Sequence, residues 1–196
     1  MLLAVTGNSG CGQSTFAAEL DRLGARVCSL DRVGHRILAR PAVSAAVAEE
    51  LGLGGCGDLP PREFRRRVGK RVFADSGSRR RLESILHPRM RRWAHISAHR
   101  LHDRCGLWVL EGALVLELGL GELADVIVVV SDTLQRCRLR AAARDGIDPA
   151  TVEARWAAQW SIRRKESLAD VVVANSEGVG RLLARSRALY SELSRM

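Results

Sequence analysis

A glycine-rich segment near the start of the chain has the residue types and spacing of a phosphate-binding loop. In LLAVTGNSGCGQST, four residues separate Gly7 from Gly12, and Ser14 follows shortly after. This matches the pattern G-x-x-x-x-G-K-[ST], whose backbone N–H groups surround phosphate oxygens and whose hydroxyl ligates Mg²⁺. Gln13 stands where the pattern has lysine, so the loop lacks the usual charge. The alternative is a strand-to-helix turn capped by Ser14.

Two carboxylates follow apolar segments that read as buried strands. Asp31 could accept the proton of an attacking hydroxyl or hold a magnesium-bound water. Glu111 stands at the end of the run LWVL, where an acid could support magnesium. Each residue has a structural alternative: Asp31 as the N-cap of a helix that begins at Arg32, and Glu111 as a cap or a surface ion pair.

Two arginines lie four residues apart in the segment LRAAARDGID. Arg140 and Arg144 therefore share one face of a predicted helix and could converge on one polyphosphate. Basic residues continue from there to Lys165, which suits a lid that closes over a nucleotide. A solvated charged helix explains the same pattern equally well.

The elements that must position these residues alternate along the chain. Short apolar runs predict strands buried on both faces, and the longer segments between them have helical patterns. This alternation predicts an α/β fold with a parallel sheet. The expected strands are Leu2 to Thr6, Arg26 to Ser29, Leu107 to Leu110, Val126 to Val130 and Val171 to Val173.

The third expected strand comes unusually late, after a long, mainly helical and arginine-rich stretch. It includes expected helices over 61–74, 78–86 and 88–104, the last two divided before Pro88. We expect one domain over residues 1–196, with a core at 1–40 and 106–196, a helical insert at about 41–105, and a lid at about 140–168. The insert would receive a second substrate.

The composition favours a globular protein with phosphate-bearing partners. The 196 residues are 46% hydrophobic and 27% charged, and the net charge is +9. Among 31 basic residues only Lys70 and Lys165 are lysines, and the guanidinium group of arginine matches phosphate geometry. The clusters at 65–67 and 79–81 could neutralise nucleic acid, but no motif for reading nucleic acid accompanies them, so we expect no nucleic-acid partner.

The cysteines and the N-terminal residues predict a reduced, cytoplasmic setting. The five cysteines are an odd number without short paired spacing, and the first residues lack the basic region of a secretion signal. No apolar stretch predicts a membrane span.

His95, His99 and His102 have helical spacing that a zinc site could use, although packing or surface positions are commoner for such histidines. We expect the small side chain of Cys11 to fill space in the loop. The alternative is that its thiol is sensitive to oxidation.

Several segments, in order along the chain, resemble dephospho-CoA kinase, the P-loop kinase family that completes coenzyme A synthesis. They are the loop from Thr6 to Thr15, LGARVCSLDRVGHRIL, FRRRVGKRVFADSGSRRRLESILHPRM, VLEGALVLE, ARDGID and AAQWSIRRKESLADVVVANS. The most specific combination is Val72, Phe73, Asp75, Leu82, Ile85, His87 and Pro88, followed by Arg144, Asp145, Ala158, Gln159, Lys165, Asp170 and Asn175. The resemblance covers nearly the whole chain.

The resemblance implies a P-loop kinase fold of three α/β/α layers, a mainly parallel sheet, a helical substrate-binding insert and a lid. Mg²⁺ would lie on Ser14, with Glu111 in indirect support, and dephospho-CoA would occupy the cleft below the insert. Asp31 would act as general base on the ribose 3′-hydroxyl, and Arg140 and Arg144 would cover the phosphates. Arg65 and His87 would bind the substrate. ATP would lie on Gly7, Asn8, Ser9, Gly10, Cys11, Gly12, Gln13, Ser14 and Thr15.

The departures from the family pattern lie near the expected chemistry. Gln13 replaces the loop lysine, and the loss of one such donor typically costs on the order of 10²- to 10³-fold in rate. Other departures are Asn8 and Ser9 in the loop, Ser29 for an acid, and Ala113 for a proline. The resemblance therefore implies either an active kinase that produces CoA and ADP, or a weakened or inactive member that binds nucleotide or CoA in a regulatory or structural role.

Overall fold

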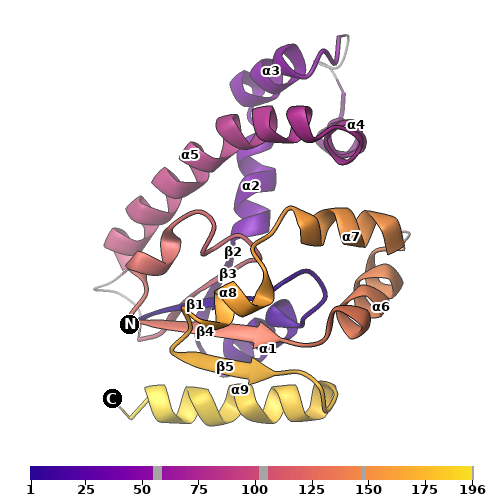
Figure 1. Cartoon of the computed structure of the whole chain (residues 1–196). Coiled ribbons are helices and arrows are strands. Elements are labelled where there is room, and N and C mark those ends of the chain that lie inside the picture. The colour runs from indigo at the N-terminus through magenta and orange to yellow at the C-terminus, as the bar shows by residue number, and fades with distance from the viewer. Residues whose placement is uncertain (55–58, 102–105, 147–148, 196) are drawn as a thin grey trace. The chain divides into compact units, whose positions relative to one another are not determined.

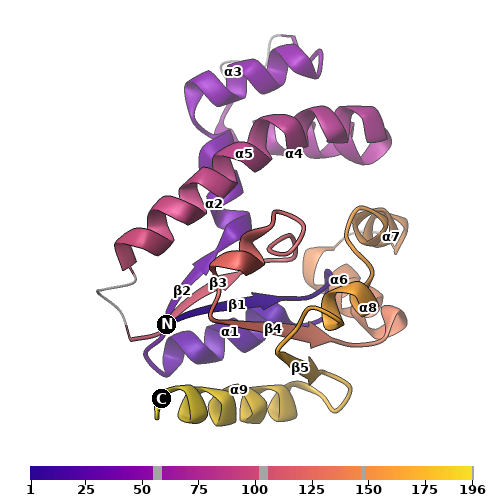
Figure 2. The ribbon, with the colours of Figure 1, turned by 60° about the vertical axis from the view of Figure 1, so that its left-hand side comes forward.

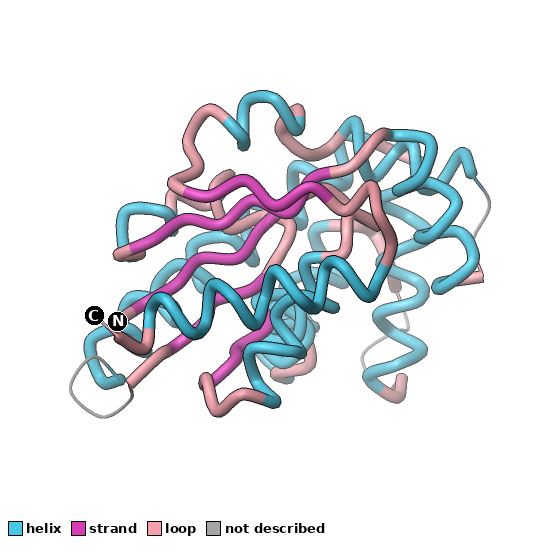
Figure 3. The backbone as a smooth tube through the Cα atoms, turned by 90° about the horizontal axis from the view of Figure 1, so that it is seen from below, coloured by secondary structure: helices cyan, strands magenta, loops and turns pink. Residues whose placement is uncertain are grey.

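Five parallel strands form one sheet in the computed structural model, which describes residues 1–54, 59–101, 106–146 and 149–195 (Figure 1). The strand order is β2-β3-β1-β4-β5, and every neighbouring pair is parallel. This confirms the α/β prediction, and Figure 3 shows the strands side by side. The strands are β1 (Leu2–Thr6), β2 (Arg26–Ser29), β3 (Trp108–Glu111), β4 (Val126–Ser131) and β5 (Val171–Ala174).

Two helices cover one face of the sheet, α1 (Gln13–Arg22) and α9 (Val179–Leu193) (Figures 1 and 2). Between them and the strands lies the main apolar core, in which Phe16, Leu20 and Leu182 pack against strand residues. Each of these large side chains is almost fully buried, which contributes roughly 1.5–3 kcal/mol per side chain relative to an exposed position.

The segment that follows β3 covers the other face together with α8 (Ile162–Glu166) (Figure 2). It contains the 3₁₀ helix η1 (Leu120–Leu123), and its side chains Val115, Leu116 and Leu120 are buried. The sequence patterns did not predict α8 or η1, because each is shorter than the two helical turns that a periodic pattern needs. With both faces covered, the apolar character of the central strands is explained. The edge strands β2 and β5 are only partly buried, so the expectation of burial on both faces is wrong for these two.

The region expected as a lid, residues 140–168, contains the second half of α6 (Leu134–Asp145), α7 (Pro149–Ala157) and α8. The hydroxyl of Thr133 caps α6 by accepting the backbone N–H of Arg136 at 3.4 Å. An ion pair between Arg138 and Glu153 joins the two helices. The arginines of α6 are thus carried on a helix that is fixed to its neighbour.

The chain divides into two compact units, Met1–Leu30 with His95–Met196, and Asp31–Ala94. The first unit holds the sheet. The second consists of helices: α3 (Pro41–Glu50), α4 (Pro61–Ala74), nearly all of α2 (Leu30–Leu38) and most of α5 (Ser76–Leu101). Within the described ranges, none of the helices has the length and apolar character needed to cross a membrane.

Helix α5 runs through Pro88, so the predicted division before this residue is wrong. Proline removes one N–H donor and crowds the carbonyl four residues earlier, here that of Ser84. Both Ser84 and Pro88 are exposed, so water can bind the carbonyl that loses its partner. The side chain of Arg89 also donates to the carbonyl of Ile85 at 2.5 Å. Residues 102–104, at the end of the helix predicted over 88–104, lie outside the described residues.

Candidate functional site

The glycine-rich loop connects the carboxyl end of β1 to the start of α1. Two of its glycines have backbone angles in the left-handed region, with φ of 84° at Gly10 and 105° at Gly12. A Cβ atom at Gly10 would collide with the carbonyl oxygen of Cys137, and one at Gly12 would lie 2.6 Å from the side-chain nitrogen of Asn175. Glycine is therefore required at both positions by backbone angle and by space.

Helix α1 begins directly behind this loop, at Gln13. Its N-cap is Gly12, which makes no side-chain cap. The Ser14 hydroxyl does not cap the helix but donates to Oε1 of Glu111, at the end of β3, over 2.8 Å. Unbonded N–H groups at a helix N-terminus, together with a preceding glycine loop, form a site for an anion. A hydroxyl beside a buried carboxylate adds oxygen donors of the kind that Mg²⁺ prefers.

Residues from the last turn of α7 to the start of α8 hold the first part of the loop. The backbone N–H of Ser9 donates to Oε1 of Gln159 at 3.1 Å, and its carbonyl accepts from Nε1 of Trp156 at 2.9 Å. Nδ2 of Asn8 donates to the carbonyl of Trp160 at 3.2 Å. The N–H of Ser9 would become available to a bound phosphate if the side chain of Gln159 moved away.

Side chains from α6 and from the end of β5 hold the second part of the loop. Nε of Arg140 donates to the carbonyl of Gly10 at 2.9 Å, while Nη2 donates to Oδ2 of Asp132 at 2.6 Å. Nδ2 of Asn175 donates to the carbonyl of Cys11 at 2.9 Å. Arg140 thus positions the loop through its backbone, a contact that the sequence did not indicate.

A buried ion pair lies behind the segment that contacts the loop. Nζ of Lys165, which is fully buried, donates to the carbonyl of Ala113 at 2.5 Å and lies 2.9 Å from Oε1 of Glu117. The same oxygen accepts the backbone N–H of Trp160 at 2.9 Å. Burial lowers the pKa of Lys165, and the Glu117 carboxylate opposes this shift.

Comparisons with known proteins show the family to which the chain belongs. The family model for dephospho-CoA kinase (CoaE) matches residues 1–180. A dephospho-CoA kinase of Anaeromyxobacter dehalogenans is 37% identical over 98% of this chain and 92% of its own length. The chain belongs to the dephospho-CoA kinase family.

Solved structures support the same assignment at the level of the fold. The crystal structure of the Thermus thermophilus protein TT1252 is 30% identical, with a TM-score of 0.77 over 98% of this chain and 97% of that one. The dephospho-CoA kinase of Campylobacter jejuni is 22% identical, with a TM-score of 0.64 over 100% of this chain and 98% of its own. The expected P-loop kinase architecture is confirmed.

For a dephospho-CoA kinase family member, the position of Gln13 is the main chemical question. Its side chain is 7% exposed at the first position of α1, and Thr15, two residues on, is exposed. An amide there can donate a hydrogen bond but adds no charge. Arg140 brings a permanent positive charge to the loop from α6, and its guanidinium group is already bound to Asp132.

The predicted base Asp31 lies in the helical unit, in the first turn of α2. The helix begins at Leu30, so Asp31 is not its N-cap. Asp31 follows two residues after Ser29, whose register partner on β3 is Glu111. His35 lies one turn further along α2, on the side that Asp31 also occupies.

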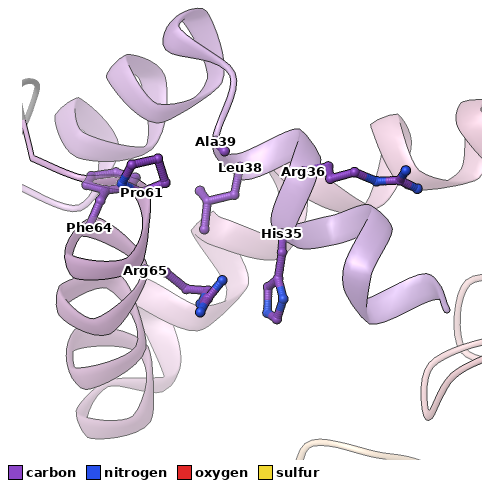
Figure 4. A pocket seen from close by; sticks show the side chains of 7 residues that line it. All are labelled: His35, Arg36, Leu38, Ala39, Pro61, Phe64 and Arg65. Carbon is purple, nitrogen blue, oxygen red and sulfur yellow. The ribbon is translucent and has the colours of Figure 1, made fainter. Parts of the chain in front are cut away.

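Arg65 and His35 line a pocket of about 220 Å³ within the helical unit. Their side chains face each other across it, from α4 and α2 (Figure 4). Partial burial and the charge of Arg65 lower the pKa of His35, while Asp31 acts in the opposite direction. The predicted residue His87 is half-buried on α5 and does not line this pocket. The full lining is His35, Arg36, Leu38, Ala39, Pro61, Phe64 and Arg65.

Two further expectations were Arg144 as a phosphate contact and a zinc site formed by His95, His99 and His102. Arg144 lies on α6, but its side chain is outside the described part of the chain, as is residue His102. Nε2 of His95 lies 3.9 Å from Oε1 of Glu122. Among the described residues, no three His, Cys, Asp or Glu side chains form a group that could hold a metal ion.

Sequence reasoning missed the residues that shape the loop from behind. Gln159, Lys165 and Asn175 belong to the motif that carries the resemblance, but the motif gave them no role. Glu117 and Trp156 were not singled out for any function. One feature of the sequence could have drawn attention to Lys165, because it is one of only two lysines in an arginine-rich chain.

Proposed function

We propose that this protein transfers the γ-phosphoryl group of ATP to the ribose 3′-hydroxyl of dephospho-CoA, giving CoA and ADP. The observation that carries the proposal is the match to the dephospho-CoA kinase family over residues 1–180, on a chain whose glycine loop is held in an anion-binding geometry. Phosphoryl transfer depends mainly on positioning and electrostatic stabilisation, which is what such a loop provides.

ATP would bind along Gly7 to Thr15, with its phosphates at the N–H groups of the loop and of the first turn of α1. The Ser14 hydroxyl and the Glu111 carboxylate fit Mg²⁺ as oxygen donors, Ser14 directly and Glu111 from behind it. When bound, Mg²⁺ neutralises charge on the phosphate oxygens. The oxygen of the Ser14 hydroxyl would bind the ion while its proton stays directed at Glu111, and Glu111 would thereby keep the hydroxyl oriented.

Dephospho-CoA would bind to the helical unit, with Arg65 as a cationic contact for its phosphates. The pocket supports this role because Arg65 and His35 present nitrogen donors beside the apolar side chains of Leu38 and Phe64. Asp31, one turn before His35 on α2, would accept the proton of the 3′-hydroxyl. His87 would assist substrate binding from α5.

The lid would comprise residues 140–168, with Arg140 and Arg144 facing the phosphates, and the helical insert residues 41–105. Arg140 binds the Gly10 carbonyl and Asp132. Its guanidinium group therefore lies beside the loop already, with N–H groups directed at the Asn175 carbonyl and at Cys137 as well, and a phosphate would be bound through the remaining N–H. We place the reaction in the cytoplasm, whose reductants would keep the thiols of the chain reduced in the absence of an oxidant.

A second candidate function is a family member that binds nucleotide or CoA without turnover. Gln13 is the observation that favours it, because the loop lysine normally offsets charge on the β- and γ-phosphates. Its neutral amide is nearly buried at that place.

One paired assay tests the proposal against this alternative. Purified native protein, Gln13→Lys, and the control Gln135→Lys, which adds a lysine at an exposed position of α6, are incubated with ATP, Mg²⁺ and dephospho-CoA. ADP release and CoA mass are measured. We expect CoA from the native protein and from the control. If only Gln13→Lys makes CoA, the native protein is a family member that binds nucleotide or CoA without turnover. If no variant makes CoA while another acceptor is phosphorylated, dephospho-CoA is rejected as the substrate.

A further inference from the structure

Two cysteine thiols meet behind the phosphate loop. Sγ of Cys11, in the loop, lies 2.9 Å from Sγ of Cys137, in the first turns of α6. Both residues are fully buried. The two cysteines are 126 positions apart in the sequence, so the fold, and no local turn, brings them together.

The separation of the two sulfur atoms is close to that of a disulfide. A disulfide bond is about 2.05 Å long, so an approach of less than about 1 Å would suffice. Cys11 lies between Gly10 and Gly12, whose backbone angles are accessible only to glycine. Cys28, the third cysteine whose side chain is described, is half-buried on β2.

The surroundings of the pair favour a thiolate at Cys11. A hydrogen bond from Cys137 lowers the pKa of Cys11, with smaller help from the charge of Arg140 and against the effect of burial. The same hydrogen bond raises the pKa of Cys137. Nη2 of Arg140 lies 3.7 Å from Sγ of Cys137. The positive charge of Arg140 beside two sulfur atoms 2.9 Å apart suits one thiol as nucleophile and the other as resolving thiol.

We propose that Cys11 and Cys137 are an oxidation site, at which a small peroxide forms a reversible disulfide that ties the phosphate loop to α6. The Cys11 sulfur attacks one peroxide oxygen: an S–O bond forms, the O–O bond breaks, and hydroxide leaves as water with the proton that Cys11 lost. The Cys137 sulfur then attacks the sulfenic sulfur of Cys11, the S–O bond breaks, and a second water leaves with the Cys137 proton. Two thiols lose two electrons in total, and the peroxide is reduced to water.

The bond would displace the loop from its present geometry. Gly10 has no space in which to follow, because the carbonyl of Cys137 already occupies the place of a Cβ atom. The movement would be taken up by the backbone of Cys11 and Gly12, which belongs to the proposed phosphate site. A shift of about 1 Å in a reacting group can cost on the order of 10²-fold in rate. This loss of turnover rests on the proposed function, whereas formation of the bond does not.

Peptide mapping tests the bond directly. Reduced native protein is treated with hydrogen peroxide, the remaining thiols are alkylated in denaturant, and the chain is cleaved with trypsin without reductant. We expect peptide 1–22, which contains Cys11, to be linked to the dipeptide Cys137–Arg138, with the mass of the two peptides less two hydrogens. Peptide 27–32, which contains Cys28, is expected to be alkylated. Alkylated Cys11 and Cys137 after oxidation, or a link from Cys11 to another cysteine, overturns the proposal.

Turnover measured on the same samples tests the effect on the loop. We expect oxidation to lower the turnover of native protein and of Cys28→Ser by 10-fold or more, with recovery after dithiothreitol. Cys137→Ser is expected to keep its turnover after the same treatment, and Cys137→Ala replaces it if the serine variant does not fold. Equal inactivation of a Cys137 variant and native protein overturns the switch. If reduced native protein shows no turnover, the proposed function fails, while the peptide map still decides on the disulfide.

Discussion

Nζ of Lys165 lies 2.9 Å from Oε1 of Glu117, and both groups are removed from solvent. The carboxylate oxygen also accepts the N–H of Trp160, whose carbonyl accepts from the side chain of Asn8. A lysine that does not belong to the phosphate loop therefore supports it from behind, through one carboxylate and one backbone segment. The loop depends on this pair even though the two residues lie in different elements.

Replacing Lys165 by methionine leaves Glu117 buried without its counter-charge. Removal of one partner of a buried pair typically costs about 3–5 kcal/mol, so we expect a loss of that size in the free energy of unfolding. Urea denaturation measures it, and Lys70→Met, at an exposed position, is the matched control. Equal stability of the two variants would show that the pair contributes nothing.

Replacing Ser14 by alanine removes the hydroxyl that lies beside Glu111. We expect turnover to fall by 10-fold or more, and the Mg²⁺ concentration for half-maximal rate to rise, since the lost oxygen is the proposed ligand. The cost in folding stability is expected to be only about 1 kcal/mol, typical of one hydrogen bond. Ser44→Ala removes a hydroxyl that donates to the Pro41 carbonyl on α3, so it serves as control. An unchanged Mg²⁺ dependence in Ser14→Ala would argue against a magnesium ligand here.

Replacing Gly10 by alanine places a Cβ atom against the Cys137 carbonyl at a φ of 84°. Strain at such an angle costs of the order of 1–3 kcal/mol, and the collision adds to it. We expect lower thermal stability and at least 10-fold weaker ATP binding by calorimetry. Gly180→Ala is the control, because its Cβ meets open space in helix α9, where alanine stabilises by up to about 1 kcal/mol. Similar ATP affinities in the two variants would contradict a sterically required glycine.

The carboxylate of Asp75 predicts a pH dependence of stability. It accepts the N–H groups of Gly77 and Ser78 at 3.0 and 2.8 Å and the Ser78 hydroxyl at 2.6 Å, at the start of α5. These bonds lower the pKa of Asp75 from 3.8 to about 2, so folding favours its ionised form. The stabilisation is complete above the ordinary pKa and is lost as the pH falls through 2.

We therefore expect the difference in unfolding free energy between native protein and Asp75→Ala to shrink as the pH is lowered from 5 to 3. Asp75→Asn retains a hydrogen-bond acceptor but cannot ionise, so its difference from the alanine variant is expected to be independent of pH. Urea denaturation at several pH values measures both differences. A native-minus-alanine difference that is constant from pH 7 to pH 3 would rule out a role for the ionised carboxylate.

The strands were predictable because their signal is local. A run of four to six apolar residues between helical patterns is too short for a buried helix, which leaves a strand. The bounds of β1 and β2 agree with the prediction. Helix α5 was predicted wrongly at Pro88, because the cost of proline depends on whether the freed carbonyl of Ser84 reaches water. That exposure is a tertiary property and has no signal in the local sequence.

The candidate site was predictable only in part, for a related reason. The phosphate loop has a spacing that local geometry demands, and so Gly7, Gly12 and Ser14 could be identified. The side chains that hold it, such as Trp156 and Gln159, act through single hydrogen bonds whose partners are distant in sequence. Arg140 was identified by its charge, but its contact with the Gly10 carbonyl could not be foreseen from helical spacing.

The hydrogen bonds to the loop also set an order of events in biosynthesis. Residues 7–12 leave the ribosome early, whereas Arg140, Trp156, Gln159 and Asn175 belong to the last third of the chain. Contacts between such distant residues form late, because a long loop must close before they are made. The nascent N-terminal segment therefore cannot take its final shape until translation is nearly finished.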